Sequence, residues 1–229
     1  LPTVTAEIPY GHIARISKGD EEPCGAWIDV SGHARRQVTE SLPYGVALLN
    51  DGKYGYDAWA RYRAYGWGAG KVHLRLTVLR SPIYVFHEPN EAQPDLPYPY
   101  QDQGPHTFRY AILPHDGTWR EGGIPRLAEA FNAPPVTLHA EKHGGPLPPQ
   151  ASFLEVSPAN ALITAVKQAE EGDDWIIRCV EAHGQDTEAA IHLPYGGLSW
   201  TFHLGHDEIK TFRLSADGQV REVDLLEDG

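Results

Sequence analysis

The chain has 229 residues, a formal net charge of −12 and a 10% share of aromatic residues. This acidic balance argues against nucleic acid as a partner, because phosphate binding needs a basic surface. The 19 prolines and 23 glycines disfavour a helix-rich architecture and indicate an all-β protein of many short strands.

Cysteine content and hydropathy indicate the cellular compartment of the protein. Cys24 and Cys179 lie far apart and form no CxxC cluster, so we expect two buried free thiols. No run approaches the roughly 18 apolar residues of a membrane helix, and the sequence from Leu1 onward lacks a signal-peptide pattern. We therefore expect a soluble, cytoplasmic protein. The absence of methionine leads us to expect a fragment or a processed product.

The first half predicts strands separated by long connections, at residues 5–8, 26–30, 46–49, 72–79 and 107–113. The apolar run at 46–49 stops at Asn50-Asp51-Gly52, which tolerate the positive φ of a turn and predict a tight reversal. An aromatic-rich loop follows it. Residues 84–104 contain four prolines, so they should form an extended surface loop outside any sheet interior.

A single helix is predicted between the two halves. Ile124, Leu127, Ala128 and Phe131 fall at i, i+3, i+4 and i+7, and the prolines at 134–135 end the pattern. Residues 143–149 are rich in glycine and proline, as is typical of a stiff linker. We therefore divide the chain into domains at 1–143 and 150–229.

The second half predicts seven short strands, at residues 152–156, 162–168, 175–181, 188–193, 198–204, 209–214 and 220–225. Turn residues lie at 171–173, 183–184 and 217–218, where we expect hairpins of an antiparallel sandwich.

Several blocks in one order resemble a known family. LLNDGKYGYD (48–57), LRLTVLRSP (74–82) and DQGPHTFRYAILPHDGTW (102–119) are similar to the C-terminal β-rich part of class II α-mannosidases, glycoside hydrolase family 38. EIPYGHIAR (7–15), EEPCGAWIDVSG (21–32), residues 152–184 and IKTFRL (209–214) extend the likeness over nearly the whole chain. The closer resemblance is to the cytosolic and bacterial branch.

The resemblance implies both an architecture and a role. Residues 1–143 would form part of a galactose-mutarotase-like supersandwich, and residues 150–229 a smaller immunoglobulin-like sandwich. The parent would be a retaining enzyme that hydrolyses terminal α-mannosides with a divalent metal, commonly zinc, held outside this chain. The chain would support the catalytic domain, be inactive alone and take a mannose-containing oligosaccharide only at the rim of the active site.

Three residues are the predicted substrate-binding positions. In the family, the turn that corresponds to Asn50, Asp51 and Lys53 projects towards the active-site cleft. A lysine there could donate hydrogen bonds to sugar hydroxyls, although it lacks the planar fork of arginine. The alternative is a polar hairpin turn in which Asn50 and Asp51 bond their own backbone.

We expect neither a catalytic carboxylate nor a metal ligand in the chain, because the His-x-Asp run of the family's metal motif does not occur in the sequence. Pairs such as His203 and His206 with Asp207 and Glu208, or His139 with Glu141, are no more frequent than chance predicts. We expect these histidines to be structural or exposed. His115-Asp116 is predicted to be a turn at a strand end, with possible exposure to the cleft.

The aromatic segment after the turn has two interpretations. Its rings could stack on sugars, or they could pack a loop onto a neighbouring domain; they are Tyr54, Tyr56, Trp59, Tyr62, Tyr65 and Trp67, interleaved with Arg61 and Arg63. If the chain is a fragment, its uncovered apolar surface should drive self-association into a homo-oligomer. The alternative function is a free-standing carbohydrate-binding or interaction β-sandwich.

Overall fold

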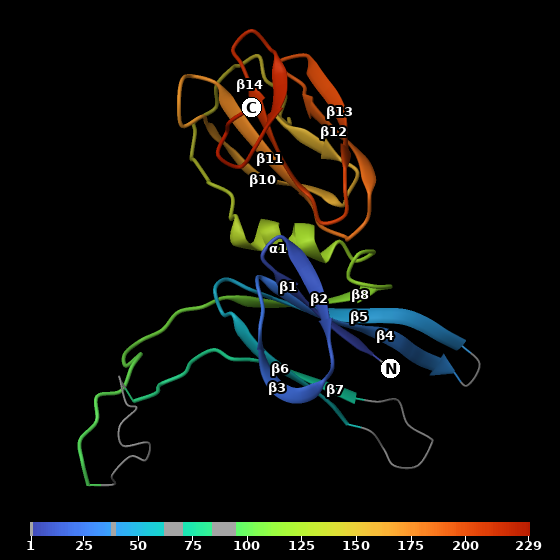
Figure 1. Ribbon diagram of the computed structural model, residues 1–229, viewed down its shortest axis with the longest axis vertical. Helices are drawn as coiled ribbons and strands as arrows, with labels where there is room; N and C mark the ends of the chain where they lie inside the picture. The colour runs from blue at the N-terminus through green and yellow to red at the C-terminus, as the bar shows by residue number, and fades with distance from the viewer. Residues whose placement is uncertain (1, 38–39, 62–70, 84–94) are drawn as a thin grey trace.

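The structure is a computed structural model, and it describes residues 2–37, 40–61, 71–83 and 95–229. The chain forms two β units with one helix between them (Figure 1). Its elements are, in chain order, β1 (Thr3–Ile8), β2 (Gly11–Arg15), β3 (Lys18–Pro23), β4 (Trp27–Gln37), β5 (Glu40–Asn50), β6 (Gly55–Arg61), β7 (Lys71–Leu76), β8 (Tyr110–Asp116), α1 (Ile124–Asn132), β9 (Glu155–Ser157), β10 (Ala161–Gln168), β11 (Trp175–Glu181), β12 (Thr187–Leu193), β13 (Leu198–Leu204), β14 (Ile209–Leu214) and β15 (Val220–Val223).

The first unit packs two antiparallel sheets face to face. Sheet A has the strand order β2-β1-β4-β5-β8, and sheet B has the order β3-β6-β7. Their shared core contains Val4, Ile28 and Tyr56, each at most 1% exposed. Tyr56 enters this core from β6, so the predicted aromatic-rich loop is wrong over residues 55–61, which form a strand.

Sheet A is buried on its second face as well. Trp27, Ala47 and Leu49 of the central strands pack there against Ile124 and neighbouring residues of α1. Successive side chains of a strand point to opposite faces, so a strand covered on both sides is apolar at every position. This explains the uninterrupted apolar run at 46–49, whose strand prediction is confirmed as part of β5.

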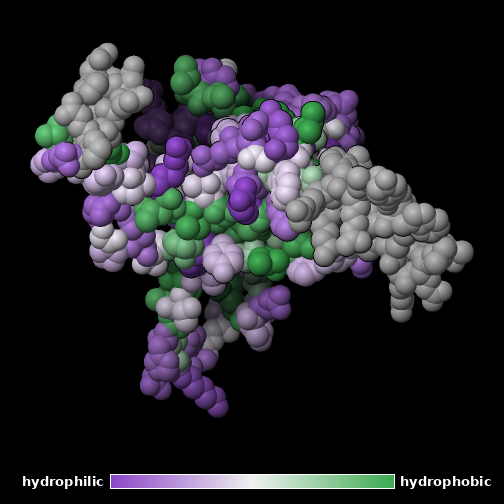
Figure 2. Space-filling model, turned by 90° about the horizontal axis from the view of Figure 1, so that it is seen from below, coloured by the Kyte–Doolittle hydropathy of each residue, from purple (hydrophilic) through white to green (hydrophobic). Residues whose placement is uncertain are grey.

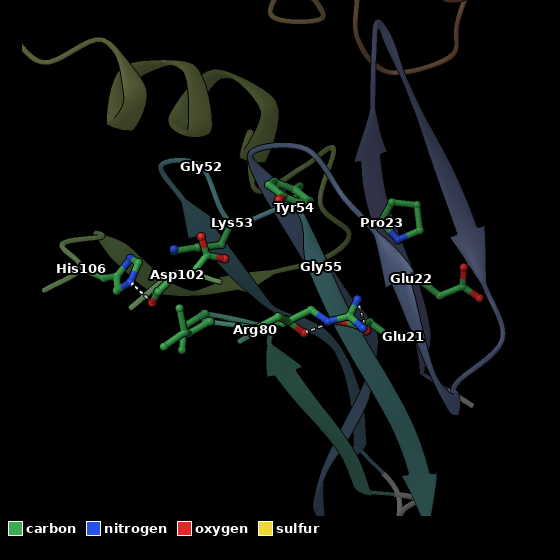
Figure 3. Close-up of a pocket in the computed structure, with 13 residues that line it drawn as sticks. Glu21, Glu22, Pro23, Gly52, Lys53, Tyr54, Gly55, Arg80, Asp102 and His106 are labelled. Carbon is green, nitrogen blue, oxygen red and sulfur yellow. Dashed lines mark hydrogen bonds and ion pairs between the residues drawn. The ribbon is translucent and has the colours of Figure 1, made fainter. Parts of the chain in front are cut away.

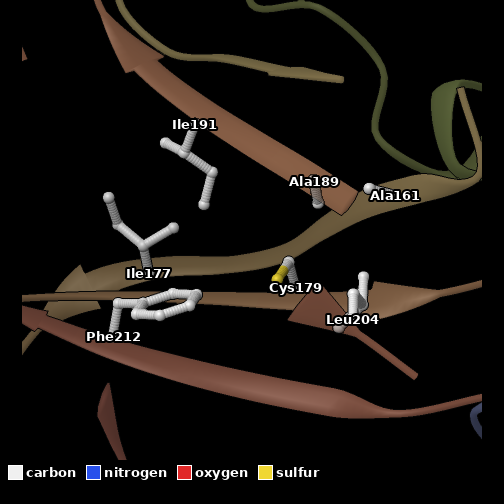
Figure 4. Packing of buried hydrophobic residues seen from close by; sticks show 7 residues of the cluster. All are labelled: Ala161, Ile177, Cys179, Ala189, Ile191, Leu204 and Phe212. Carbon is white, nitrogen blue, oxygen red and sulfur yellow. The ribbon is translucent and has the colours of Figure 1, made fainter. Parts of the chain in front are cut away.

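The second unit is a β-sandwich of two antiparallel sheets. Sheet C has the order β13-β12-β9 and sheet D the order β10-β11-β14-β15. Figure 4 shows the core between the sheets, in which the buried residues are Ala161, Ile177, Cys179, Ala189, Ile191, Leu204 and Phe212. The prediction of an all-β, antiparallel sandwich protein is confirmed.

The two cysteines are buried and free, as predicted. Burial raises the pKa of the Cys24 thiol to about 11 and that of Cys179 to about 12. Both thiols are therefore neutral and unreactive at physiological pH, because the thiolate is the nucleophile.

Two predicted reversals differ from the structure. Asn50-Asp51-Gly52 does not close a hairpin, because β5 lies in sheet A and the following strand β6 lies in sheet B. His183-Gly184 likewise carries the chain from sheet D to sheet C. By contrast, the turns at residues 171–173 and 217–218 do join paired strands. Which strands a turn joins depends on tertiary pairing, which the turn residues themselves do not encode.

The predicted boundary lies in a long irregular stretch. Residues 137–154 contain no helix or strand, and residues 137–151 are exposed throughout. They lead from α1 to the second unit along its outside (Figure 1). The division into 1–143 and 150–229 stays a prediction.

Candidate functional site

The turn after β5 is built around a buried asparagine. Asn50 is 1% exposed, and its Oδ1 accepts hydrogen bonds from the backbone N–H groups of Gly52 (3.0 Å) and Lys53 (2.7 Å). Its Nδ2 donates to the carbonyl of Gly25 at 2.9 Å. Gly52 has φ +138°, a conformation open to glycine and rare for other residues. Asn50 therefore fixes the path of the backbone from inside, and its contact with substrate stays a prediction.

Two further side chains hold the turn from outside. Asn132 at the end of α1 donates from Nδ2 to the Asn50 carbonyl at 3.0 Å. The Asp51 carboxylate accepts from the backbone N–H of Arg109 at 2.8 Å and from its Nε at 3.0 Å. The Arg109 N–H and guanidinium hold the pKa of Asp51 below its usual value. Asp51 is thus ionised and occupied in anchoring the turn to the segment before β8.

Lys53 is the part of the turn that is available to a ligand. Its Nζ lies 5.3 Å from the centroid of the Phe108 ring, within the range of a cation–π contact. Within the described parts of the chain, its ammonium group has no carboxylate partner. A partly exposed ammonium on a fixed backbone can donate up to three hydrogen bonds.

Lys53 lines an open hollow of about 470 Å³, shown in Figure 3. Its wall includes Tyr54, which is 80% exposed. Polar side chains from distant parts of the chain complete the wall: Glu21, Glu22, Arg80 and His106. The size of the hollow is within the range of small-ligand sites.

Two carboxylates of the hollow, those of Glu21 and Glu22, are already paired. Glu21 accepts from Thr77 Oγ1 at 2.7 Å and lies 3.5 Å from Arg80 Nη1. Glu22 Oε2 lies 3.6 Å from Arg15 Nε. The hollow therefore presents hydrogen-bonding groups, among them the Asp102 carboxylate, beside the exposed Tyr54, an arrangement that suits the binding of a polyhydroxylated ligand.

The residues of the aromatic segment lie in different environments. Tyr54 is exposed at the hollow, whereas Tyr56 lies in this unit's own core rather than against a neighbouring domain. Trp59 is 42% exposed and packs near His73, with ring centroids 5.7 Å apart. The predictions for Tyr62, Arg63, Tyr65 and Trp67 lie outside the described residues, as does the side chain of Arg61.

His115 differs from its prediction. It lies within β8 rather than in a turn, its side chain is 7% exposed, and its Nε2 lies 2.7 Å from Oδ1 of the fully buried Asp29. The ring fills a slot between Gly45 and Gly122, where an added Cβ would lie 2.2 Å and 2.8 Å from it. The His115–Asp29 pair is thus internal to sheet A, whereas Asp116, the last residue of β8, is exposed and its exposure to a cleft stays a prediction.

The other histidine and acid pairs form no metal centre in the part of the chain that the structure describes. No three His, Cys, Asp or Glu side chains gather there in a metal-binding arrangement. His203 pairs with Glu188 at 3.0 Å on the sandwich surface, and His206 lies in the turn after β13 beside Asp207.

Two antiparallel β units and a hollow of about 470 Å³ define a β-sandwich protein. Comparison with known families then shows which family this β-sandwich protein belongs to. The family model "Glycosyl hydrolases family 38 C-terminal domain" matches residues 2–97, and "Glycosyl hydrolases family 38 C-terminal beta sandwich domain" matches residues 160–228. The chain belongs to glycosyl hydrolase family 38, as a C-terminal region.

Curated relatives agree with this assignment. The chain is 31% identical to "Alpha-mannosidase 2C1" of Homo sapiens over 82% of its own length, and 27% identical to "Alpha-mannosidase G" of Dictyostelium discoideum over 91%. The matches span only 16% and 19% of those two proteins. The activity of the full-length relatives is therefore only a proposal for this chain.

Solved structures share the fold. A family 38 glycosyl hydrolase from Enterococcus faecalis matches 93% of this chain and 25% of its own, with a TM-score of 0.65 and 19% identity. A structure described as an alpha-mannosidase from Enterococcus faecalis V583 matches with a TM-score of 0.64 and 18% identity.

Proposed function

We propose that the chain is the C-terminal region of a retaining, metal-dependent α-mannosidase that hydrolyses terminal α-mannosides. The names of the curated relatives and the two family matches support the α-mannoside specificity. Retention would proceed through a glycosyl-enzyme intermediate formed by a carboxylate about 5–5.5 Å from a second carboxyl group. Both carboxyl groups would lie in the catalytic region of the parent.

The proposed divalent metal, commonly zinc in this family, would also lie outside this chain. The described residues do not fit such a centre, since they bring no three metal-binding side chains together.

Within the parent, this chain would support the catalytic region and contribute Lys53 to the rim of the site. The observation that carries this role is the fixed turn: Asn50, Asp51 and Asn132 immobilise its backbone, while the Lys53 ammonium stays available beside the hollow. A donor held in place before the ligand arrives loses little conformational entropy on binding. We propose that Lys53 donates to a hydroxyl of a mannose-containing oligosaccharide.

The surface of sheet B supports docking of the catalytic region. On the molecule's sheet B end, hydrophobic side chains gather in a band between polar ones (Figure 2). Near this sheet, Trp59, Val78 and Leu79 are 42%, 37% and 50% exposed. Exposed apolar surface of this kind marks interaction sites.

Location in the cytoplasm and self-association stay predictions. Among the helices of the described chain, none has the length and apolar character needed to cross a membrane.

The test is Lys53→Ala in the full-length parent. Loss of a charged hydrogen bond should cost about 1.5–3 kcal/mol, which corresponds to roughly a ten- to hundredfold lower kcat/KM on an aryl α-mannoside. Lys142→Ala is the matched control, because Lys142 is an exposed lysine on the irregular stretch far from the turn. It should leave kcat/KM unchanged, and both variants should keep the melting temperature of the parent.

Kinetics of Lys53→Ala equal to those of Lys142→Ala would remove Lys53 from substrate binding and leave the chain a supporting role alone. Binding of mannose oligosaccharides by the isolated chain, with no α-mannosidase activity in the parent, would favour a free-standing carbohydrate-binding module.

A further inference from the structure

The two units contact each other at α1, where Arg126 Nη2 donates to the Ala161 carbonyl at 3.1 Å, and at a small polar joint between loops. We define the joint as His12, Trp119 and Arg120 of the first unit and His183 and Asp207 of the second. His12 lies at the start of β2, and Asp207 in the turn between β13 and β14. The irregular stretch 137–154 is the covalent connection between α1 and the second unit.

Arg120 bridges the joint. Its Nε donates to the carbonyl of His183 at 2.6 Å, and its Nη2 lies 3.1 Å from His12 Nε2. Its guanidinium carbon lies 4.1 Å from the Trp119 ring centroid. Arginine has donors only, so His12 Nε2 must accept this hydrogen bond. The geometry therefore requires a neutral His12 with its proton on Nδ1.

The other side of the His12 ring faces the second unit. His12 Nδ1 lies 3.7 Å from Asp207 Oδ1, and both atoms are buried without a hydrogen-bond partner among the described residues. Gly184 approaches the ring so closely that an added Cβ would lie 2.8 Å from His12 Cε1. The imidazole is thus wedged between Arg120 and the second unit.

We propose that His12 is a pH-sensitive latch between the two β units: the neutral imidazole closes the joint, and its protonation opens it. Protonation would place an N–H on Nε2, directly against the Arg120 donors. The hydrogen bond would be lost, and two positive charges would face each other about 3 Å apart in a partly buried site.

Other charges around His12 act in both directions. Asp207 and Glu181 of the second unit favour the protonated ring, whereas Arg120 and His206 oppose it. Burial is the largest effect on the ring and opposes protonation, so the pKa of His12 lies below its usual value. His183, which also faces the joint, has its pKa lowered by burial.

The direction of the pH effect follows from these shifts. A histidine whose pKa is lower in the closed joint than in water holds fewer protons when closed. Its contribution to closure is present above about pH 6.5 and is lost as the pH falls through the lowered value. The latch is therefore closed at neutral pH and opens in acid.

The test is small-angle X-ray scattering of the 229-residue chain at pH 7.5 and pH 5.0. The radius of gyration should increase at pH 5.0 in the wild type while circular dichroism shows both units folded. His12→Gln should abolish the increase, because the glutamine amide offers an acceptor to Arg120 and does not titrate. His203→Gln, a control on the exposed surface of the second unit, should respond like the wild type.

Equal radii of the wild type at both pH values would overturn the proposal, and so would a response of His12→Gln equal to that of His203→Gln. An NMR titration of the His12 ring in the wild type gives an independent readout that needs no variant. A pKa below 6.5 is expected; a value at or above 6.5 would contradict the latch.

Discussion

A single carboxylate organises the loops where the second unit faces the first. Glu181 is fully buried and accepts hydrogen bonds from Asn160 Nδ2 (2.9 Å) and from the backbone N–H groups of His183 (2.8 Å), Gln185 (2.9 Å) and Asp207 (3.2 Å). Burial alone would raise the pKa of Glu181, but these four donors outweigh it and leave the pKa below its usual value. The carboxylate thus stays ionised and holds the turns that carry the latch.

Glu181→Gln should therefore destabilise the chain at neutral pH. The amide would lose the charge and place an N–H₂ donor among four donors, at a cost of about 1.5–3 kcal/mol in the free energy of unfolding. Because the native pKa is depressed, the carboxylate's contribution is present above the unfolded value near 4.5 and is lost as the pH falls through the native value. Urea unfolding at pH 7 and pH 3 should show the difference between wild type and variant shrinking in acid.

Glu188→Gln is the matched control, since the side chain of Glu188 is 76% exposed on the same sandwich. Its stability should stay close to that of the wild type at both pH values. A Glu181→Gln chain as stable as Glu188→Gln at pH 7 would contradict the assigned role of the buried carboxylate.

At the residue level, the sequence predicted which residues form a turn better than it predicted which residues enclose them. Asn50, Asp51 and Gly52 were recognisable as a turn because their side chains and backbone favour it. The burial of Asn50 was not predictable, since Gly25 and Asn132, which enclose it, are distant in sequence. The hollow was not predictable either. Glu21, Arg80 and His106 lie far from Lys53 in the sequence, and the tertiary fold brings them together.

Among the elements, those with an apolar period were predictable. The spacing of Ile124, Leu127, Ala128 and Phe131 predicted α1, which is confirmed as Ile124–Asn132. Strand β3, with the sequence KGDEEP, carries no apolar period and was missed. It is held to β6 through backbone pairing at the sheet edge, a contribution that hydrophobic patterning does not report.

Substitutions on the buried and the exposed face of α1 test whether this helix covers sheet A. Ile124 is fully buried against the Trp27 and Leu49 side of the sheet, whereas Leu127 is 45% exposed. Ile124→Ala should lower the free energy of unfolding by about 2–5 kcal/mol, the usual range for a core truncation. Leu127→Ala should cost less than half as much in the same urea titration. Equal losses would mean that α1 does not cover the sheet in this orientation.

At the scale of the whole molecule, four layers follow one another: sheet B, sheet A, α1 and the second sandwich (Figure 1). The all-β class was predictable from composition and alternation. The layer order was not, because it depends on where the chain crosses between sheets, as it does at Asn50-Asp51-Gly52 and at His183-Gly184. The first was predicted as a tight reversal and the second as a hairpin, since turn residues specify a change of direction and do not specify the partner strand.

We propose that this chain supports an α-mannosidase without carrying its catalytic residues. The most direct measurement is hydrolysis of an aryl α-mannoside by the full-length parent and by the isolated 229-residue chain, at equal concentration and with zinc present. We predict release of the aryl group by the parent and none by the isolated chain, whose described residues offer no metal centre. Hydrolysis by the isolated chain, or a parent that cleaves no α-mannoside, would contradict the account.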